Sequence, residues 1–568
     1  MNTEPSLTRA KSRAALGICL VILVWLASLF AVHPLGNFPL NDDWSFGQAV
    51  RILMEKHDFR PSGWTAMPLI TNVLWGGLFC LPSGFSFTAL RVSTLVAALA
   101  GIVGIYWLLK QSRAPDWLAL LAALLFGFNP VYYALSCSFM TDVPFATLTI
   151  IAAVFLLRNL AKGADRDLFL GTAFVLIATL SRQLALAVPL AFAITSILKN
   201  GFNPSKLWRA CLPAALGVIA LVLFQHWMAA TGRLSAMYSQ KSGELTQALT
   251  DPIHTLPEFA HNLYVAFLYL GLFLSPILFY VLAAVWQSEP KKTKLIFAAS
   301  LWIILLACYC YKSRGIYMPL SSNILDSSGI GPVTLRDAAI LQINLLPELP
   351  PTFWKLVTLI SVLGAVALMT LAGVILSNVL PKWRAREMND SDTAAVFNLV
   401  CAAIYLAPLL VTIFFDRYLI VVIPFLAAAV AAVCPPLPKL NLKVFFPATA
   451  ILVGLMLYAV CGTHDYLGWN TARWVAINNL MANEHVKPEE MDGGFEFNAL
   501  YFFNPNYSVL QNEKSWWWVQ GDTYLISFGS VPGYRTLKEY PYTRWLPPSH
   551  GAVLVSKKSD SSAAAKAK

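Results

Sequence analysis

Charged residues are scarce in this sequence. They make up only 12% of its 568 residues, while 57% are hydrophobic. A soluble protein carries about twice that share of charge, so a soluble globular fold is excluded. Many apolar runs approach or exceed the roughly 20 residues that cross a bilayer as a helix. The sequence therefore predicts a polytopic α-helical membrane protein, and the net charge of +11 indicates membrane topology, with no nucleic acid as a partner.

The nine cysteines follow no pattern that would indicate a disulfide or zinc scaffold. Most of them fall in apolar runs, and none lies after residue 463. Their spacing is typical neither of a disulfide framework nor of a metal site. Cys308 and Cys310 are close together, but we expect them to face lipid or the core.

Thirteen apolar segments are long enough, or nearly long enough, to be transmembrane helices. The fifth and the sixth are short. We place the thirteen at residues 14–34, 89–109, 117–135, 142–161, 168–181, 184–198, 210–229, 262–286, 295–311, 354–380, 395–415, 418–434 and 445–462.

Lysine and arginine are distributed unevenly among the connections. Nineteen of the 41 lie in the N-terminal tail and in every second connection, whereas the short connections opposite hold Arg182, Arg417 and little else. The positive-inside rule places basic connections in the cytoplasm. We therefore expect a multi-pass protein of the plasma (inner) membrane, with its N-terminus in the cytoplasm and its C-terminus outside.

The first external loop, residues 35–88, is predicted to hold two helices that lie on the membrane. Residues 45–57 place apolar side chains at helical spacing, with polar ones on the opposite face. Residues 64–82 contain no charge, but a crossing there would move every later basic connection outside. We therefore predict an interfacial or re-entrant helix in this stretch.

The composition changes near residue 463. We predict a transmembrane domain over residues 1–463 and a small extracytoplasmic α/β domain over residues 464–568. The stretch YLGWNTARWVAINNLMANE has helical periodicity, while DTYLISFG and GAVLVSKK are typical of strands. The last residues, SDSSAAAKAK, have the composition of a disordered tail.

Three acidic residues lie in nearly uncharged surroundings. Asp42 and Asp43 follow the first predicted span, and Asp142 begins the fourth. Each of these positions also suits a helix N-cap. A carboxylate at a membrane surface can instead act as a general base or hold a metal. The predicted topology places all three on the external side, which makes them candidates for catalysis.

Four cations lie on the same predicted side, namely Arg182, Lys312, Arg314 and Arg417. Arginine and lysine beside apolar segments suit a phosphate at headgroup level. One alternative is snorkelling to lipid headgroups. Another is that Asp416 and Arg417 form an ion pair that orders their own turn.

Together these motifs resemble the GT-C superfamily of membrane glycosyltransferases, in the branch of protein O-mannosyltransferases and lipid A aminoarabinose transferases (glycosyltransferase family 39). The resemblance covers nearly the whole chain. Its elements are Asp42-Asp43, where the family has Asp-Glu, then Thr141-Asp142, and then Arg417-Tyr418 followed by Pro424. Two further segments, GIGPVTLRD and MDGGFEFN, resemble a bacterial subgroup.

The resemblance implies inverting transfer of a sugar from a polyprenyl-phosphate-linked donor to an extracytoplasmic acceptor, such as a cell-envelope glycan, lipid or protein. Asp42 would be the general base, assisted by Asp43 and Asp142, and the four cations would hold the donor phosphate. A divalent cation bound by Asp42 and Asp142 is a further alternative that the sequence does not decide. The partners are the donor, membrane lipids and the acceptor.

Two other classes of function remain as alternatives. A transporter or flippase of lipid-linked sugars would also have many spans, although such proteins often show inverted repeats and none is visible here. A non-enzymatic protein of envelope assembly is the second.

Overall fold

The structure is a computed structural model that describes residues 4–321, 323–412, 414–435, 442–507 and 517–559. The helices of the first half are α1 Glu4–Val32, α2 Asp43–Lys56, α3 Ile70–Cys80, α4 Phe87–Gln111, α5 Asp116–Gly127, α6 Pro130–Ser136, α7 Asp142–Lys162, α8 Asp165–Thr179, α9 Ala187–Asn200, α10 Pro204–Ala230, α11 Ala236–Thr250 and α12 Pro252–Ser288. Those of the second half are α13 Pro290–Tyr311, α14 Arg336–Ala339, α15 Pro351–Ala385, α16 Asp390–Leu410, α17 Val422–Ala432, α18 Leu442–Asn483 and α19 Phe495–Phe502. Short 3₁₀ turns are η1 Gln183–Leu186, η2 Lys312–Arg314, η3 Asp416–Val421 and η4 Pro488–Glu490.

The polytopic helical fold is confirmed, but thirteen spans is too many. Among the described residues, ten helices are long and apolar enough to cross a bilayer, or up to eleven if α5 and α6, bent by 60°, form one span. The predicted spans 168–181 and 418–434 coincide with α8 and α17, which have 15 and 11 residues. At about 1.5 Å per residue, neither helix reaches the roughly 30 Å of the hydrocarbon core.

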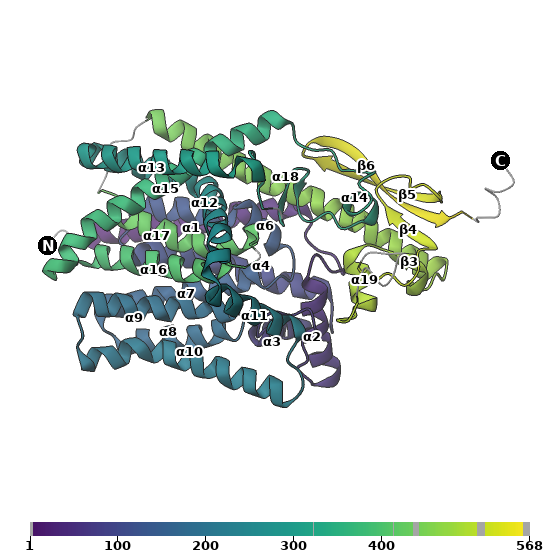
Figure 1. Cartoon of the computed structure of the whole chain (residues 1–568), viewed down its shortest axis with the longest axis horizontal. Coiled ribbons are helices and arrows are strands. Elements are labelled where there is room, and N and C mark those ends of the chain that lie inside the picture. Colours follow the sequence, from purple (N-terminus) through teal and green to yellow (C-terminus); the bar gives the residue numbers. More distant parts are fainter. Residues whose placement is uncertain (1–3, 322, 413, 436–441, 508–516, 560–568) are drawn as a thin grey trace.

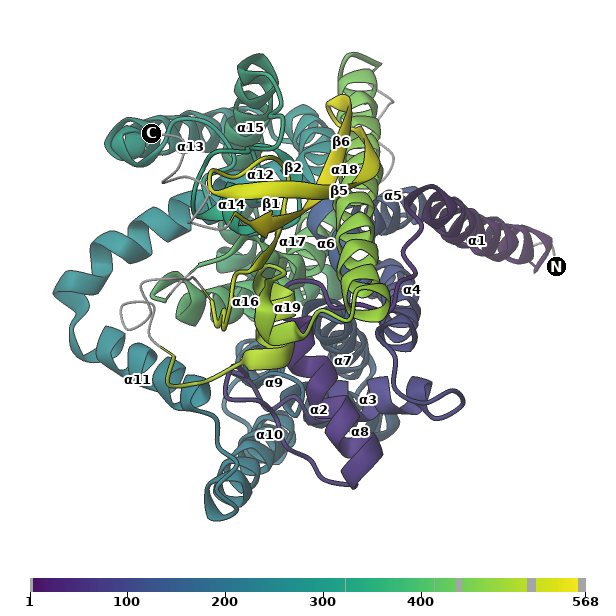
Figure 2. The ribbon, with the colours of Figure 1, turned by 90° about the vertical axis from the view of Figure 1, so that its right-hand side faces the viewer.

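The long helices run side by side, and the strands gather at one end of them (Figure 1). Helices α2, α3 and α19 lie toward that same end, while the N-terminus lies at the other. Figure 2 looks onto the strand end and shows α19 next to α2, two helices that are in contact. The first loop and the C-terminal region, far apart in sequence, are therefore neighbours.

Several of the basic connections meet one another. Asp390 begins α16 and accepts hydrogen bonds from Arg113 (2.6 Å) and Lys199 (3.5 Å), so three connections share one carboxylate. Asn389 and Asp392 form a capping box at the same helix start. Helix α7 has 21 residues, about 30 Å, so it separates Asp142 at its start from the basic residues at its end.

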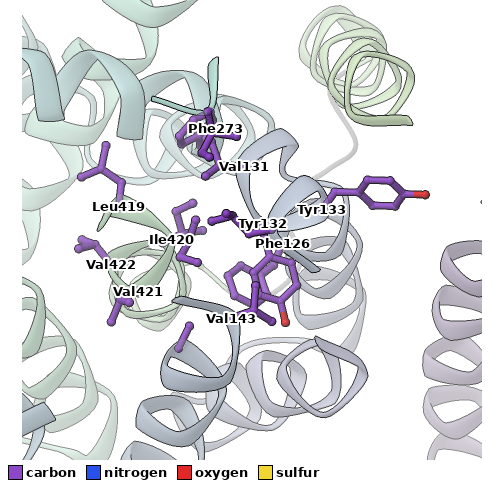
Figure 3. Close-up of a cluster of buried hydrophobic side chains, with 14 of the residues drawn as sticks. Phe126, Val131, Tyr132, Tyr133, Val143, Phe273, Leu419, Ile420, Val421 and Val422 are labelled. Atoms are coloured by element: carbon purple, nitrogen blue, oxygen red, sulfur yellow. The ribbon is translucent and has the colours of Figure 1, made fainter. Parts of the chain in front are cut away.

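Helices α12 and α15 approach closely at two glycines. A Cβ on Gly271 or on Gly364 would collide with backbone atoms of the partner helix. Small residues at such a crossing allow two membrane helices to pack backbone to backbone. This contact fixes the position of α12, whose Phe273 is fully buried in the apolar cluster shown in Figure 3.

A buried apolar cluster joins the short helix α6 and the adjoining ends of α5, α7 and η3 (Figure 3). Phe126 and Tyr132 of α5 and α6 lie there with Val143 of α7 and Ile420 of η3, and all four are fully buried. Val143 follows Asp142 in sequence. Core packing therefore holds the start of α7 and the turn η3 in fixed relation.

A small sheet is present near the C-terminus, as predicted. Its strands are β3 Met491–Asp492, β4 Tyr524–Ser527, β5 Tyr534–Trp545 and β6 Pro548–Lys558, in the order β3-β4-β6-β5. Strand β3 is parallel to β4, and the other pairs are antiparallel. The stretches DTYLISFG and GAVLVSKK contain β4 and most of β6, so both strand predictions are confirmed. A separate two-stranded ladder pairs β1 Leu325–Asp326 with β2 Gly329–Ile330.

Helix α18 connects the membrane region to this sheet without a break. It contains the predicted helix YLGWNTARWVAINNLMANE except for its last residue, Glu484, and runs through residue 463. Asp465 of α18 accepts hydrogen bonds from the backbone N–H groups of Trp545 (2.7 Å) and Leu546 (2.8 Å). The sheet is thus attached to the helix by a buried carboxylate. The predicted disordered tail, except for Ser559, lies outside the described residues.

The two helices predicted in the first loop are present as α2 and α3. Helix α3 has 11 residues, about 16 Å, which is too short to cross the bilayer. We therefore expect both flanks of α3 to lie on the same side of the membrane.

Arg60→Cys and Ser83→Cys place a thiol at an exposed position on each flank. Both should react with an impermeant maleimide added to one face of sealed vesicles, after subtraction of the labelling of the parent protein. Reaction at only one of the two positions would show that residues 64–82 cross the membrane.

Candidate active site

Asp43 is a structural carboxylate. It is the first residue of α2 and is fully buried. One oxygen accepts from the backbone N–H of Leu40 (2.6 Å) and the other from that of Phe139 (3.0 Å). Burial raises the pKa of Asp43 to about 7, although nearby Arg91 and these N–H groups lower it. Asp43 therefore fastens the start of α2 to the connection between α6 and α7.

Asp42 has a different environment. Its side chain is 16% exposed. One oxygen accepts from the indole Nε1 of Trp64 (2.9 Å), and the other lies 3.1 Å from Nη1 of Arg417. Asp42 occupies the N-cap position of α2, but its side chain makes no capping hydrogen bond. The N-cap alternative therefore does not account for this carboxylate.

Asp142 and Arg182 form a second, buried ion pair. Oδ2 of Asp142 lies 3.0 Å from Nη2 of Arg182, and both side chains are almost completely buried. Arg182 also donates from Nε to the hydroxyl of Thr141 (2.8 Å). Thr141 is the N-cap residue of α7, yet it makes no side-chain capping bond. The motif Thr141-Asp142 thus serves to hold Arg182.

Arg417 connects the two pairs electrostatically. Burial by itself lowers the pKa of Arg417, but Asp42, Tyr418 and Asp142 raise it above the usual value for arginine. Its guanidinium lies 5.3 Å from the ring centre of Phe415. Two carboxylates and two guanidinium groups therefore form one neighbourhood, built from the starts of α2 and α7 and from the turns that precede η1 and form η3.

Asp416 does not serve as the partner of Arg417. Its carboxylate accepts from the backbone N–H groups of Ile324 (3.1 Å) and Leu325 (2.7 Å). Burial raises the pKa of Asp416 to about 6, against the lowering effect of these hydrogen bonds. Asp416 thus anchors η3 to the start of β1, and Arg417 pairs with Asp42.

Lys312 and Arg314 are placed elsewhere. Both lie in η2 and are exposed. Lys312 lies over the ring of Tyr309 (4.2 Å), and Arg314 pairs with Glu258 (2.8 Å). Within the described residues neither contacts Asp42 or Asp142. The structure therefore brings together two of the four predicted phosphate ligands, Arg182 and Arg417.

Three charged residues that support this neighbourhood were missed in the sequence. Arg91 of α4 donates to the carbonyls of Pro34 (3.0 Å) and Phe38 (2.6 Å). Glu496 of α19 accepts from the backbone N–H of Asn41 (3.1 Å) and pairs with Arg473 of α18 (2.7 Å). Each is a lone charge in an apolar or aromatic stretch, which is the signal that identified Asp142.

The predicted metal site is a poor fit. Asp42 and Asp142 each have an arginine partner, so a cation would have to displace a guanidinium group. Among the described residues, no group of three or more His, Cys, Asp or Glu could hold a metal ion. Asp42 and Asp142 are thus arranged to bind guanidinium groups and not a metal ion.

The comparisons with known proteins bear on the class of this site. Residues 67–229 match the family model described as dolichyl-phosphate-mannose-protein mannosyltransferase, over between a quarter and a third of the chain. The resemblance to the GT-C membrane glycosyltransferases is confirmed. The matched segment includes Asp142 and Arg182, and it lies between Asp42 and Arg417 in sequence. The chain is thus a multi-pass membrane protein in which residues 67–229 are similar to a family of membrane glycosyltransferases.

No curated protein matches the chain in sequence. Two similar solved structures are both of ArnT from Cupriavidus metallidurans. The form bound to undecaprenyl phosphate is 14% identical, covers 96% of this chain and 98% of that chain, and has a TM-score of 0.44. The apo form is 16% identical, covers 86% and 84%, and has a TM-score of 0.34. Both TM-scores lie below 0.5.

The buried pair of Asp142 and Arg182 predicts a pattern of stabilities. Asp142→Asn or Arg182→Met alone leaves a buried charge without its partner, which typically costs roughly 3–5 kcal/mol. The double variant leaves no unpaired charge and should regain part of that loss. Thermal unfolding in detergent measures both effects.

Glu55→Gln is the matched control for this experiment. Glu55 pairs with Arg51, and both side chains are 54% exposed, so its loss should cost about 1 kcal/mol or less. A double variant that is no more stable than the weaker single variant would contradict coupling within the buried pair.

Proposed function

We propose that this chain is an inverting glycosyltransferase that moves a sugar from a polyprenyl-phosphate-linked donor to an acceptor outside the cytoplasm. The observation that carries the proposal is the pairing of Asp42 with Arg417, next to that of Asp142 with Arg182. A general base and ligands for a phosphate leaving group are thereby adjacent. The donor class follows the matched family, whose description names a sugar on dolichyl phosphate.

The reaction is a single displacement. The acceptor hydroxyl gives its proton to the carboxylate of Asp42 while its oxygen forms a bond to the anomeric carbon of the sugar. The bond from that carbon to the phosphate oxygen breaks, and the phosphate keeps the electron pair. Arg417 and Arg182 stabilise the charge that develops on the leaving phosphate. One displacement at the anomeric carbon inverts its configuration.

Asp42 has to leave Arg417 before it can act as the base. While one of its oxygens faces that guanidinium group, this oxygen is not free to receive the proton of an acceptor hydroxyl. A donor phosphate that binds Arg417 replaces one anion with another and frees the carboxylate. Donor binding would therefore precede activation of the acceptor.

We further propose that the site faces the outside, with the N-terminus in the cytoplasm and the C-terminus outside. Basic connections from three parts of the chain converge on Asp390. Helix α7 places Lys162, in its last turn, a full helix length away from Asp142, at its start. Under the positive-inside rule the basic end is cytoplasmic. A lipid-linked sugar would then reach the site from the outer leaflet.

Asp42→Asn tests the assignment of the base. Transfer should fall by at least about a hundredfold, within the range for loss of a general base, while donor binding and membrane insertion persist. Asp43→Asn should cost less in rate but more in thermal stability, because an amide can accept from only one of the two N–H groups that Asp43 satisfies. Asp142→Asn should have an intermediate effect on the rate.

The assay uses proteoliposomes, a panel of polyprenyl-phosphate sugars and a cell-envelope extract as the acceptor source. Glu55→Gln, on the exposed face of the same helix, is the control and should turn over normally. A severe loss in Asp43→Asn alone would reassign the base. Normal turnover in all three aspartate variants would remove this mechanism and leave transport of a lipid-linked sugar as the better account.

The four cations should separate into two classes in the same assay. Alanine at Arg417 or Arg182 removes a charge-assisted contact worth roughly 1.5–3 kcal/mol, so the donor KM should rise about ten- to a hundredfold. Alanine at Lys312 or Arg314 should leave the donor KM unchanged, because both side chains are exposed and lie away from the carboxylates. The opposite ranking would place the phosphate at η2.

A further inference from the structure

We infer that Glu496, in the C-terminal region, is a positioning residue that holds the Asn41–Asp42 turn in place for catalysis. The inference rests on the proposed function, since it assigns Asp42 the role of the base. Two segments of the sequence, GIGPVTLRD and MDGGFEFN, have no part in the proposed mechanism, and Glu496 belongs to the second of them. The structure places Thr334 of the first segment and Glu496 of the second in direct contact (2.8 Å).

The carboxylate of Glu496 divides its two oxygens between two tasks. Oε2 accepts from Nη1 of Arg473 (2.7 Å) and from the hydroxyl of Thr334 (2.8 Å). Oε1 accepts from the backbone N–H of Asn41 (3.1 Å). Glu496 and Arg473 are both fully buried. The first oxygen thus fixes Glu496 within the C-terminal region, and the second reaches the residue that precedes Asp42.

The held turn has a backbone conformation that needs support. Asn41 has φ +54°, in the left-handed region that few residues other than glycine adopt readily. Arg91 binds the carbonyls of Pro34 and Phe38 on the N-terminal side of the turn, and Asp43 binds Phe139 on its other side. Leu40 and Asp43 are also hydrogen-bonded to each other across the turn (2.6 Å), and Glu496 holds the backbone of Asn41 between them.

The local backbone around Glu496 is itself closely fitted. Gly494 has φ +89°, and a Cβ there would lie 2.6 Å from the carbonyl oxygen of Thr334 and 2.8 Å from Nη2 of Arg473. The N–H of Phe495 donates to that same carbonyl (3.1 Å), and Nε of Arg473 donates to the carbonyl of Gly493 (2.8 Å). Gly494 therefore lets the start of α19 approach Thr334 and Arg473, and this approach places the carboxylate of Glu496 next to the turn.

This arrangement makes the C-terminal region part of the active site. A misplacement of about 1 Å in a reacting group can cost on the order of a hundredfold in rate. The position of Asp42 depends on its neighbour Asn41, and that of Asn41 on Glu496. Loss of the hydrogen bond should therefore reduce the rate of the chemical step without changing the contacts of either substrate.

Glu496→Gln tests this role, because an amide has one acceptor oxygen where the carboxylate has two. Arg473 carries a charge and should retain that oxygen, so the amide NH₂ would face the N–H of Asn41. We expect kcat to fall by about ten- to a hundredfold with unchanged KM for donor and acceptor. We also expect faster deuterium uptake in a peptide that covers residues 34–44, measured on the full chain by mass spectrometry.

A control variant separates positioning from general destabilisation. Asp465→Asn weakens a buried carboxylate of α18 that binds the backbone N–H groups of Trp545 and Leu546, with no contact to the 34–43 turn among the described residues. This variant should lower thermal stability, yet keep kcat within about twofold and leave uptake in the 34–44 peptide unchanged.

Glu496→Asp serves if the glutamine variant does not fold. It keeps both acceptor oxygens for Arg473 and Thr334 but is too short to reach Asn41, so it should show the same two effects. Unchanged uptake in this peptide, or a kcat loss equal to that of Asp465→Asn at matched stability, would overturn the inference. The proposed function fails separately, if Asp42→Asn keeps its activity, and the exchange measurement still decides whether Glu496 holds the turn.

Discussion

A single ion pair joins Asp42, which follows the first span, to Arg417, the second residue of η3. The two residues are 375 positions apart in the sequence. A largely buried charge without a partner is strongly destabilising, so the start of α2 and the turn η3 must stay together. The surrounding carboxylates serve this constraint. Asp43 fastens α2 to the α6–α7 connection, and Asp416 fastens η3 to the start of β1. Each binds backbone N–H groups, and Asp42 and Arg417 are paired with each other.

The same constraint suggests how the site could change partners during a reaction. Asp42 with Arg417 and Asp142 with Arg182 leave no net charge in the neighbourhood. An incoming phosphate can take the place of a carboxylate on a guanidinium group without leaving the cation unpaired. The released carboxylate then needs a new partner, and an acceptor hydroxyl provides one. In the proposed mechanism, charge balance thereby links donor binding to the release of Asp42 as the base.

Part of this site could be predicted from the sequence, because lone charges are rare beside apolar helices. That signal identified Asp42, Asp142, Arg182 and Arg417, which the structure brings together. The same signal also selected Lys312 and Arg314, which are exposed, since rarity says nothing about where a side chain points. Asp42 and Asp43 could not be distinguished either. Adjacent residues at a helix start point in directions about 100° apart, and only the fold determines which one is buried.

Other features depend on contacts that no local pattern contains. The short helices α8 and α17 resemble spans in composition but lack the length, and α17 is apolar because it is almost completely buried. Glu496 and Arg473 lie in a region treated as a separate domain, and their link to Asn41 crosses 455 positions of sequence. The helical class and the strands β4 and β6, by contrast, follow from periodicity within each segment.

A structure of the full chain with a bound polyprenyl phosphate tests the proposed mechanism most directly. We expect the phosphate oxygens to contact Arg417, and the carboxylate of Asp42 to have moved out of hydrogen-bonding distance from that guanidinium, while Asn41 stays bound to Glu496. A phosphate bound elsewhere, with Asp42 and Arg417 still paired at about the 3.1 Å seen here, would contradict it.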